Sequence, residues 1–136
     1  MTNPTRARGG ELVERMGIRI TERTADRTAG TMPVVGNRQP YGLLHGGASA
    51  VLAETLGSLH AAAVAPANRV PVGTDLNCTH HRAMSSGTVY GVSTPVHIGR
   101  SMSCFEVVIS DEAGRRVCTA RLTCAYIDAS RGKVIG

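Results

Sequence analysis

The longest helical pattern in this chain runs from Gly46 to about Val64, and strand-like segments make up most of the chain after it. The helix begins at a Gly-Gly pair and is expected to end before Pro66 and Asn68. An apolar stripe is predicted on one face, at Val51, Leu52, Thr55, Leu56, Leu59 and Ala63. A second stripe holds the small residues Gly47, Ala50, Gly57, Ser58 and Ala61, together with one carboxylate, Glu54. Small residues allow close approach, so we expect this second face to meet a neighbouring subunit or a ligand.

The rest of the chain favours a sheet. Strands are predicted at residues 69–81, 87–98, 101–111 and 115–127, separated by short polar or Gly-containing turns. Before the long helix, we predict a short helix at 11–16, a half-buried strand at 18–23 and an edge strand at 31–34, because Pro33 is tolerated at a sheet edge. One buried helix beside a meandering antiparallel sheet is an α+β arrangement.

Length and hydropathy limit the organisation. A chain of 136 residues can build one real core, so we predict a flexible N-terminus at 1–10 and a single domain at 11–136. No apolar run is long enough to cross a membrane. The first ten residues contain no apolar stretch of the secretory type, which favours a cytoplasmic location.

The chain is basic, with a formal net charge of +5, and only one of its 15 basic residues is Lys. Scattered arginines, with one Phe and three Tyr for stacking, argue against nucleic-acid binding. Arginine makes bidentate contacts to phosphate, so the composition suits a ligand with several phosphates, such as coenzyme A.

The cysteines and histidines do not indicate a metal or a disulfide. Cys78, Cys104, Cys118 and Cys124 lie in apolar or β-rich stretches and are expected to be reduced, partly buried thiols. Four of the five histidines are considered as metal ligands, but they have no Cys or carboxylate near them at typical ligand spacing, so no metal site is predicted; these four are His60, His80, His81 and His97.

The segment from Gln39 to Gly47 leads directly into the helix and predicts a reactive site. Free backbone N–H groups at a helix N-terminus favour negative charge. A carboxylate such as Glu54 on an otherwise small, apolar helix is costly unless it does chemistry. The pattern therefore indicates an oxyanion-stabilising site with a nucleophile or general base, although alone it also allows a solvated Glu54 or one paired with an Arg.

These residues resemble the hotdog-fold acyl-CoA thioesterases, and most closely the branch with the phenylacetate-pathway thioesterase and the glutamate-using 4-hydroxybenzoyl-CoA thioesterase. The resemblance rests on Gln39, His45-Gly46-Gly47, Glu54 and Ser58, followed by residues 77–82, 94–101, 106–115 and 120–123. It covers roughly residues 11 to 128. It implies a hotdog fold, in which an antiparallel sheet wraps around one long central helix, and hydrolysis of an acyl-CoA to a free acid and coenzyme A.

The resemblance implies five catalytic residues, four of them with a stated role. Glu54 attacks the thioester carbonyl or activates the water that does, and Ser58 lies one turn later on the same helix face. The backbone N–H of Gly46 donates to the thioester oxygen, and His45 orients the loop and the substrate. Gln39 holds the substrate or the hydrolytic water.

The remaining family residues are expected to bind the substrate, and no cofactor is implied beyond the coenzyme A of the substrate itself. They are Gly47, His81, Arg82, Gly99, Arg100 and Ser101. The branch suggests an aromatic acyl group, of the benzoyl or dihydroxynaphthoyl type. Phe105 stands where many relatives have Trp, and aromatic residues are only 3% of the chain. A pocket for an aliphatic acyl group is therefore an alternative to an aromatic one.

Gly46 and Glu54 are eight residues apart, which places their backbones roughly 12 Å apart along the helix. One carbonyl is not expected to touch both within one chain, so we predict a composite site in a homodimer. The resemblance agrees and implies further pairing into tetramers. Two alternatives are a hotdog dehydratase or hydratase, whose His and helical carboxylate are spaced differently, and a non-catalytic acyl-CoA-binding module.

Overall fold

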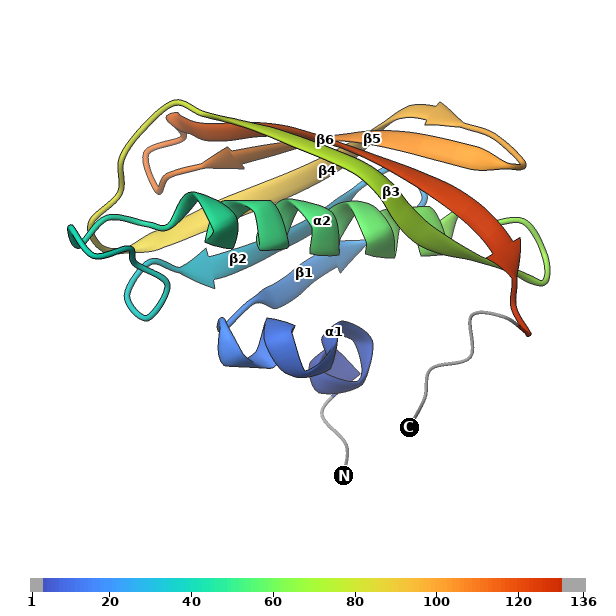
Figure 1. Cartoon of the computed structure of the whole chain (residues 1–136), viewed down its shortest axis with the longest axis horizontal. Coiled ribbons are helices and arrows are strands. Elements are labelled where there is room, and N and C mark those ends of the chain that lie inside the picture. Colours follow the sequence, from blue (N-terminus) through green and yellow to red (C-terminus); the bar gives the residue numbers. More distant parts are fainter. Residues whose placement is uncertain (1–3, 131–136) are drawn as a thin grey trace.

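A computed structural model describes residues 4–130, which form two helices and six strands (Figure 1). In chain order these are α1 (Pro4–Arg15), β1 (Arg19–Arg23), β2 (Thr28–Pro33), α2 (Gly46–Ala63), β3 (Arg69–His80), β4 (Thr88–Ile98), β5 (Met102–Ser110) and β6 (Arg116–Asp128). The strands make one antiparallel sheet in the order β1-β2-β4-β5-β6-β3. The sheet curves around α2, and α1 lies against α2 and β1. This is the α+β arrangement that the sequence predicts, with one long central helix.

The core fills the space between α2 and the concave face of the sheet. Leu52 and Leu56 of α2 are fully buried, as are Val89, Val107 and Ile109 of the sheet. The burial of apolar side chains from both layers is the main favourable contribution to the packing of the helix against the sheet. None of the helices in residues 4–130 is long and apolar enough to cross a membrane.

The predicted faces of α2 are only partly correct. Leu52 and Leu56 belong to the core as predicted, whereas Val51, Thr55 and Leu59 lie on the side that faces α1. The small-residue stripe is also divided: Gly57 and Ala61 are buried against the sheet, while Glu54 is exposed. The helix is covered from several directions, by the sheet and by α1, so a one-sided stripe underestimates its buried surface.

Two predictions before α2 are wrong in their details. The first helix begins at Pro4 rather than near residue 11, since Pro suits the first helical position. Gly10 in its middle has non-helical angles, φ 78° and ψ −174°, so the helix is kinked there. β2 is an inner strand and not an edge strand, because it pairs with both β1 and β4. Pro33 is its last residue, where a missing N–H costs the least pairing.

The four strands after α2 lie within one residue of the predicted boundaries at most ends. β3 forms one edge of the sheet and pairs only with β6 among the described strands. It spans 12 residues, from Arg69 to His80, most of them exposed or half-buried. A long edge strand carries a row of unpaired backbone groups and is open to pairing with another strand.

Candidate active site

The N-terminus of α2 is capped by the residue that precedes it. His45 has extended angles, φ −66° and ψ 131°, and its Nδ1 accepts a hydrogen bond of 2.8 Å from the N–H of Gly47. Gly46 is the first residue of the helix, so its own N–H has no acceptor within the helix. The predicted donor therefore points from the positive end of the helix, and the cap on Gly47 adds a specific hydrogen bond to the loop-orienting role that is predicted for His45.

The loop before the cap is fixed by hydrogen bonds between its own residues and to a neighbouring segment. The N–H of His45 donates to the carbonyl of Asn37, and the N–H of Leu44 donates to the carbonyl of Met84, at 2.9 and 2.7 Å. The side-chain oxygen of Gln39 accepts from the N–H of Tyr41. In this conformation Gln39 is turned back onto its loop, although it still lines the cavity at the helix N-terminus.

His80, for which no site role is predicted, lies directly beside Gly46. A Cβ atom placed on Gly46 would lie 3.0 Å from Nε2 of His80, so any side chain there would require the His80 ring to shift slightly. His80 is the last residue of β3, next to His81 and Arg82, which are predicted to bind substrate. The signal for His80 in the sequence is its place in residues 77–82, which carry part of the family resemblance and include these two predicted site residues.

A cavity of about 380 Å³ opens at this end of the molecule. It is lined by ten residues: Gln39, Leu43, Leu44, Gly46, Ser49, His80, His81, Arg82, Ala83 and Val117. His81 already has a hydrogen-bond partner within the chain, because its Nε2 is 2.8 Å from the hydroxyl of Thr119. Arg82 is exposed at the rim. A cationic side chain and a helix N-terminus in one cavity can attract an anionic or strongly polarised group.

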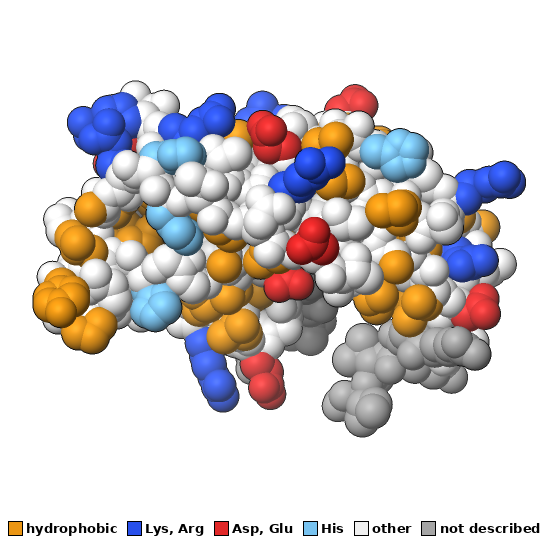
Figure 2. All heavy atoms as spheres, turned by 45° about the horizontal axis from the view of Figure 1, so that its top comes forward, with side chains coloured by type: hydrophobic (Ala, Val, Ile, Leu, Met, Phe, Trp, Pro, Cys, Tyr) orange, Lys and Arg blue, Asp and Glu red, His pale blue; other side chains and the backbone are white. Residues whose placement is uncertain are grey.

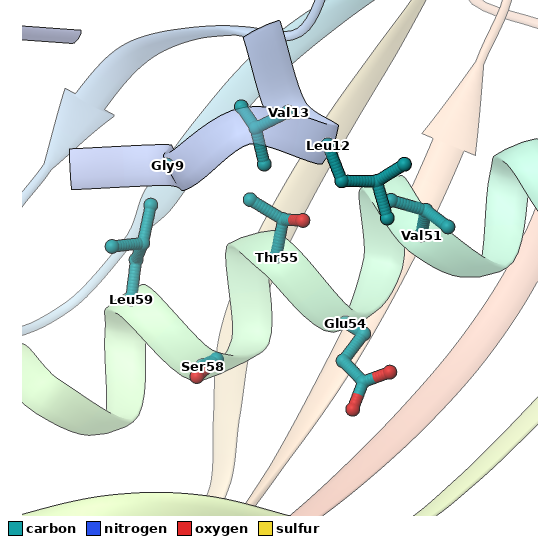
Figure 3. Close-up of a pocket in the computed structure, with 8 residues that line it drawn as sticks. All are labelled: Gly9, Leu12, Val13, Val51, Glu54, Thr55, Ser58 and Leu59. Atoms are coloured by element: carbon teal, nitrogen blue, oxygen red, sulfur yellow. The ribbon is translucent and has the colours of Figure 1, made fainter. Parts of the chain in front are cut away.

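Glu54 and Ser58 line a second cavity, of about 310 Å³, between α2 and α1 (Figure 3). Its other lining residues are Gly9, Leu12, Val13, Val51, Thr55 and Leu59. In Figure 3, Thr55 and Leu59 point toward α1, whereas the Glu54 carboxylate points away from it. One side of the cavity is thus mainly apolar, and the other carries a carboxylate and a hydroxyl, as the shared helix face of Glu54 and Ser58 predicted.

The Glu54 carboxylate reaches toward β3. A Cβ atom on Gly73 would lie 2.8 Å from Oε2 of Glu54, so the carboxylate lies against bare backbone. Glu54 makes no hydrogen bond or ion pair with the residues that the structure describes. An exposed carboxylate without such a partner keeps its lone pairs available for a proton or a carbonyl carbon.

The cysteines near this carboxylate are poor nucleophiles. Burial raises the pKa of Cys124 to about 11, and the negative charge of Glu54 adds to the effect. Burial also raises the pKa of Cys78, and burial with the nearby Cys78 raises the pKa of Cys118 to about 12. Their thiols stay protonated near neutral pH, and the thiolate is the reactive form. All four cysteines are unpaired, as predicted.

The predicted segment from Gly99 to Ser101 lies at the other end of the sheet from Gly46 (Figure 1). It is the tight connection between β4 and β5, where the N–H of Gly99 donates to the carbonyl of Met102 at 2.9 Å. Arg100 and Ser101 are both exposed. Within one chain this segment is therefore not brought together with the N-terminus of α2.

The two halves of the candidate site also lie apart within one chain. Gly46 and Gln39 line one cavity and Glu54 and Ser58 line another, with no lining residue in common. Eight residues of helix separate Gly46 from Glu54, or roughly 12 Å of rise. The prediction of a composite site started from the distance between Gly46 and Glu54, and the two residues are indeed far apart within one chain.

Charged side chains are interspersed on the face shown in Figure 2, where basic, acidic and histidine side chains lie among each other. Ion pairs among the described residues include Arg27 with Glu22 and Arg115 with the buried Asp111. This face carries no continuous basic stripe of the kind that follows a nucleic-acid backbone.

Comparison of the sequence with known families and proteins adds to this geometry. The pattern of the Thioesterase superfamily matches residues 41–118. The chain is 51% identical over 119 residues to the proofreading thioesterase EntH of Cronobacter turicensis, and the match covers 87% of each chain. It is 48% identical over 117 residues to the proofreading thioesterase EntH of Klebsiella pneumoniae, covering 85% of each.

Solved structures give the same result. A thioesterase from Haemophilus influenzae superposes with a TM-score of 0.87 and 35% identity, over 92% of this chain and 88% of the other. A mutant thioesterase from Pseudomonas aeruginosa superposes with a TM-score of 0.86 and 32% identity, over 94% of this chain and 96% of the other.

Proposed function

The chain belongs to the thioesterase superfamily with the hotdog fold and is a thioester hydrolase, and from this premise we propose that it hydrolyses an acyl-CoA to a free acid and coenzyme A. The observation that carries the proposal is the cavity between α1 and α2, whose lining combines mainly apolar side chains with Glu54 and Ser58. An acyl thioester has the same division, with an apolar group next to a polar reacting carbonyl. Hydrolysis is favoured over the dehydratase and the binding-module alternatives by the thioesterases at about half identity.

Glu54 performs the reaction in one of two ways. As a general base it takes a proton from water, the resulting hydroxide adds to the carbonyl carbon, and the C–S bond breaks with release of a thiolate that is then protonated. As a nucleophile its carboxylate adds directly, the thiolate leaves, and water hydrolyses the mixed anhydride that forms. Both routes give the same acid and thiol, and both suit a carboxylate without a hydrogen-bond partner.

The N–H of Gly46 polarises the thioester carbonyl in this proposal. Each route passes through an oxyanion, and a preorganised donor at the positive end of a helix stabilises that charge. The cap at His45 and the hydrogen-bonded loop fix the donor before substrate binds. His80 packs beside Gly46 and narrows the space in which the carbonyl oxygen can lie.

A composite site brings the two halves together in a homodimer. Glu54 and Ser58 of one subunit face Gln39, His45 and Gly46 of the other. Two features support this assembly: the separation of roughly 12 Å along α2, and the exposed edge strand β3, which offers unpaired backbone groups for a partner. Pairing of two dimers into a tetramer is part of the same proposal.

Coenzyme A is recognised by exposed arginines and nearby polar side chains in this proposal. His81 and Arg82 line the cavity that also includes Gly46, and Arg100 and Ser101 lie at the far end of the sheet. Charge-assisted hydrogen bonds from arginine suit the phosphates of this ligand. In a dimer the two groups need not come from the same subunit, so their separation within one chain is compatible with one extended ligand.

The acyl group is proposed to be compact and aromatic, of the benzoyl or dihydroxynaphthoyl type, as in the phenylacetate-pathway and 4-hydroxybenzoyl-CoA branch. A cavity of about 310 Å³ is at the small end of ligand sites. The relatives at 51% and 48% identity are named proofreading thioesterases, which supports a role in removing an incorrect acyl group. We place this role in the cytoplasm.

The test is hydrolysis of aromatic, short-chain and long-chain acyl-CoAs, followed through the free thiol with a thiol-reactive dye. The proposal predicts turnover that is highest for compact aromatic groups and is lost in Glu54→Gln. Highest turnover on long aliphatic chains would contradict the acyl assignment, and no thiol release from any acyl-CoA would contradict the choice of coenzyme A thioesters.

A further inference from the structure

The residue opposite Glu54 has no side chain. Gly73 lies on β3, and a Cβ atom placed there would be 2.8 Å from Oε2 and 3.8 Å from Cδ of Glu54. The shorter of these contacts is well inside ordinary van der Waals distance. Any side chain at this position would therefore compete directly with the carboxylate for the same space.

The backbone at Gly73 is held in place by a β-bulge. The pairing of β3 with β6 shifts between Gly73, which lies opposite Cys124, and Asp75, which lies opposite Thr123. The extra residue, Thr74, donates its hydroxyl to the carbonyl of Thr123 at 3.1 Å. Bulges locally reorient a strand and recur beside functional sites. Here the bulge begins at the residue under the carboxylate.

Packing decides where this carboxylate lies. Among the residues that the structure describes, none donates a hydrogen bond or forms an ion pair with Glu54. Its flexible side chain therefore has no polar anchor, and the bare backbone of Gly73 is the surface that its Oε2 approaches. The shape of β3 at this point fixes how far the carboxylate can swing toward the sheet.

We propose that Gly73 is a positioning residue, whose missing side chain gives the Glu54 carboxylate the place from which it reacts. The inference rests on the proposed function, because it assumes that Glu54 carries the reaction. It adds a residue on the sheet to a site whose other members lie on α2 and the loop before it. Gly73 acts through Glu54 and not by contact with the reacting atoms.

A methyl group at Gly73 would move the carboxylate and leave the fold intact. The atom it meets is the far end of a flexible side chain, which can rotate away at little cost, and its next neighbour, Cδ1 of Leu122, is at an ordinary 3.5 Å. Catalysis is less tolerant, since a displacement of about 1 Å can cost roughly 10²-fold in rate. Gly73→Ala is therefore expected to lower kcat by about 10- to 100-fold, with KM and the melting temperature nearly unchanged.

The decisive experiment combines Gly73→Ala with Glu54→Asp in a double-mutant cycle. Asp is one methylene shorter, so its carboxylate does not reach the new methyl group. If Gly73 acts through Glu54, the double variant has the kcat of Glu54→Asp alone, and the two losses do not multiply. Val72→Ala is the matched control, since it alters the neighbouring residue on the opposite face of β3 and is expected to keep full activity.

Each outcome decides the proposal. Multiplicative losses would show that Gly73 affects the rate independently of Glu54 and would overturn the inference. An unchanged kcat in Gly73→Ala would overturn it as well. This measurement does not depend on the activity of Glu54→Asp, so it tests the inference even if that variant is inactive. Near-normal turnover in Glu54→Ala would instead contradict the proposed function, so the two failures are distinguishable.

Discussion

The loop that leads into α2 and the middle of α2 carry the two halves of the candidate site, and they are held in place differently. At the N-terminus of α2, backbone hydrogen bonds from His45 and Leu44 and the cap on Gly47 fix the N–H of Gly46. In the middle of α2, Glu54 has no polar partner among the described residues and lies against Gly73. One half is fixed by directional hydrogen bonds, whereas the other is limited by its contact with the bare backbone of Gly73.

The difference matches what each half is proposed to do. An oxyanion donor is effective when it is already oriented, because no reorganisation is needed as charge develops. A general base or nucleophile must present free lone pairs, and hydrogen bonds from the protein would occupy them. We therefore expect substitutions at the α2 N-terminus to affect all substrates alike, and substitutions around the Glu54 cavity also to alter selectivity.

The largest effect is expected from Glu54→Gln. The amide keeps the shape of the side chain but can neither take a proton from water nor attack the carbonyl, so kcat should fall by roughly 10²- to 10⁴-fold. Circular dichroism and the melting temperature should be those of the parent protein. A variant that hydrolyses acyl-CoA at nearly the parent rate, by any thiol assay, would remove Glu54 from the reaction.

The next largest effect is expected from Gly46→Pro, compared with Gly46→Ala. Proline is tolerated at the first helical position and lacks the N–H, and the angles of His45 suit a following proline. Alanine adds a Cβ beside His80 but keeps the donor. The proline variant should therefore have a kcat roughly 10²- to 10³-fold below the alanine variant, by the same factor on every acyl group. Equal rates for the two variants would show that this N–H is not the oxyanion donor.

A smaller, substrate-dependent effect is expected at Leu12, on the α1 side of the Glu54 cavity. Leu12→Trp narrows the cavity, so kcat/KM should fall by roughly 10-fold for bulky acyl groups and change little for acetyl-CoA. Leu12→Met, of similar volume, is the matched control. If the tryptophan variant loses the same factor on all acyl groups, the cavity between α1 and α2 does not hold the acyl chain.

The sequence predicted the parts of this molecule that have a strong local signal. α2 begins at Gly46, as the Gly-Gly pair after a loop predicted. The four later strands were predicted from the clear turn residues between them. Glu54 and Ser58 share a cavity because residues four apart lie on the same helix face. The resemblance to the hotdog thioesterases is confirmed at the level of the superfamily.

The features that the sequence could not predict depend on contacts between distant segments. His80 lies beside Gly46, and Gly73 lies beside Glu54, only because β3 pairs with β6 at the sheet edge and passes next to α2. The inner position of β2 has the same origin, since its pairing with β4 joins residues far apart in the chain. Local propensity carries no information on such pairings.

The central claim is that one active site takes its two halves from two subunits, and subunit mixing tests it most directly. Glu54→Gln and Gly46→Pro subunits, each nearly inactive alone, are mixed in equal amounts under conditions that allow exchange. In a mixed dimer with two-fold symmetry, one site receives both substitutions and the other receives neither. About half of the dimers are mixed after full exchange, so about a quarter of the parent activity should return. If native mass spectrometry confirms mixed dimers while activity stays at the level of the separate variants, both halves belong to one chain and the composite site is contradicted.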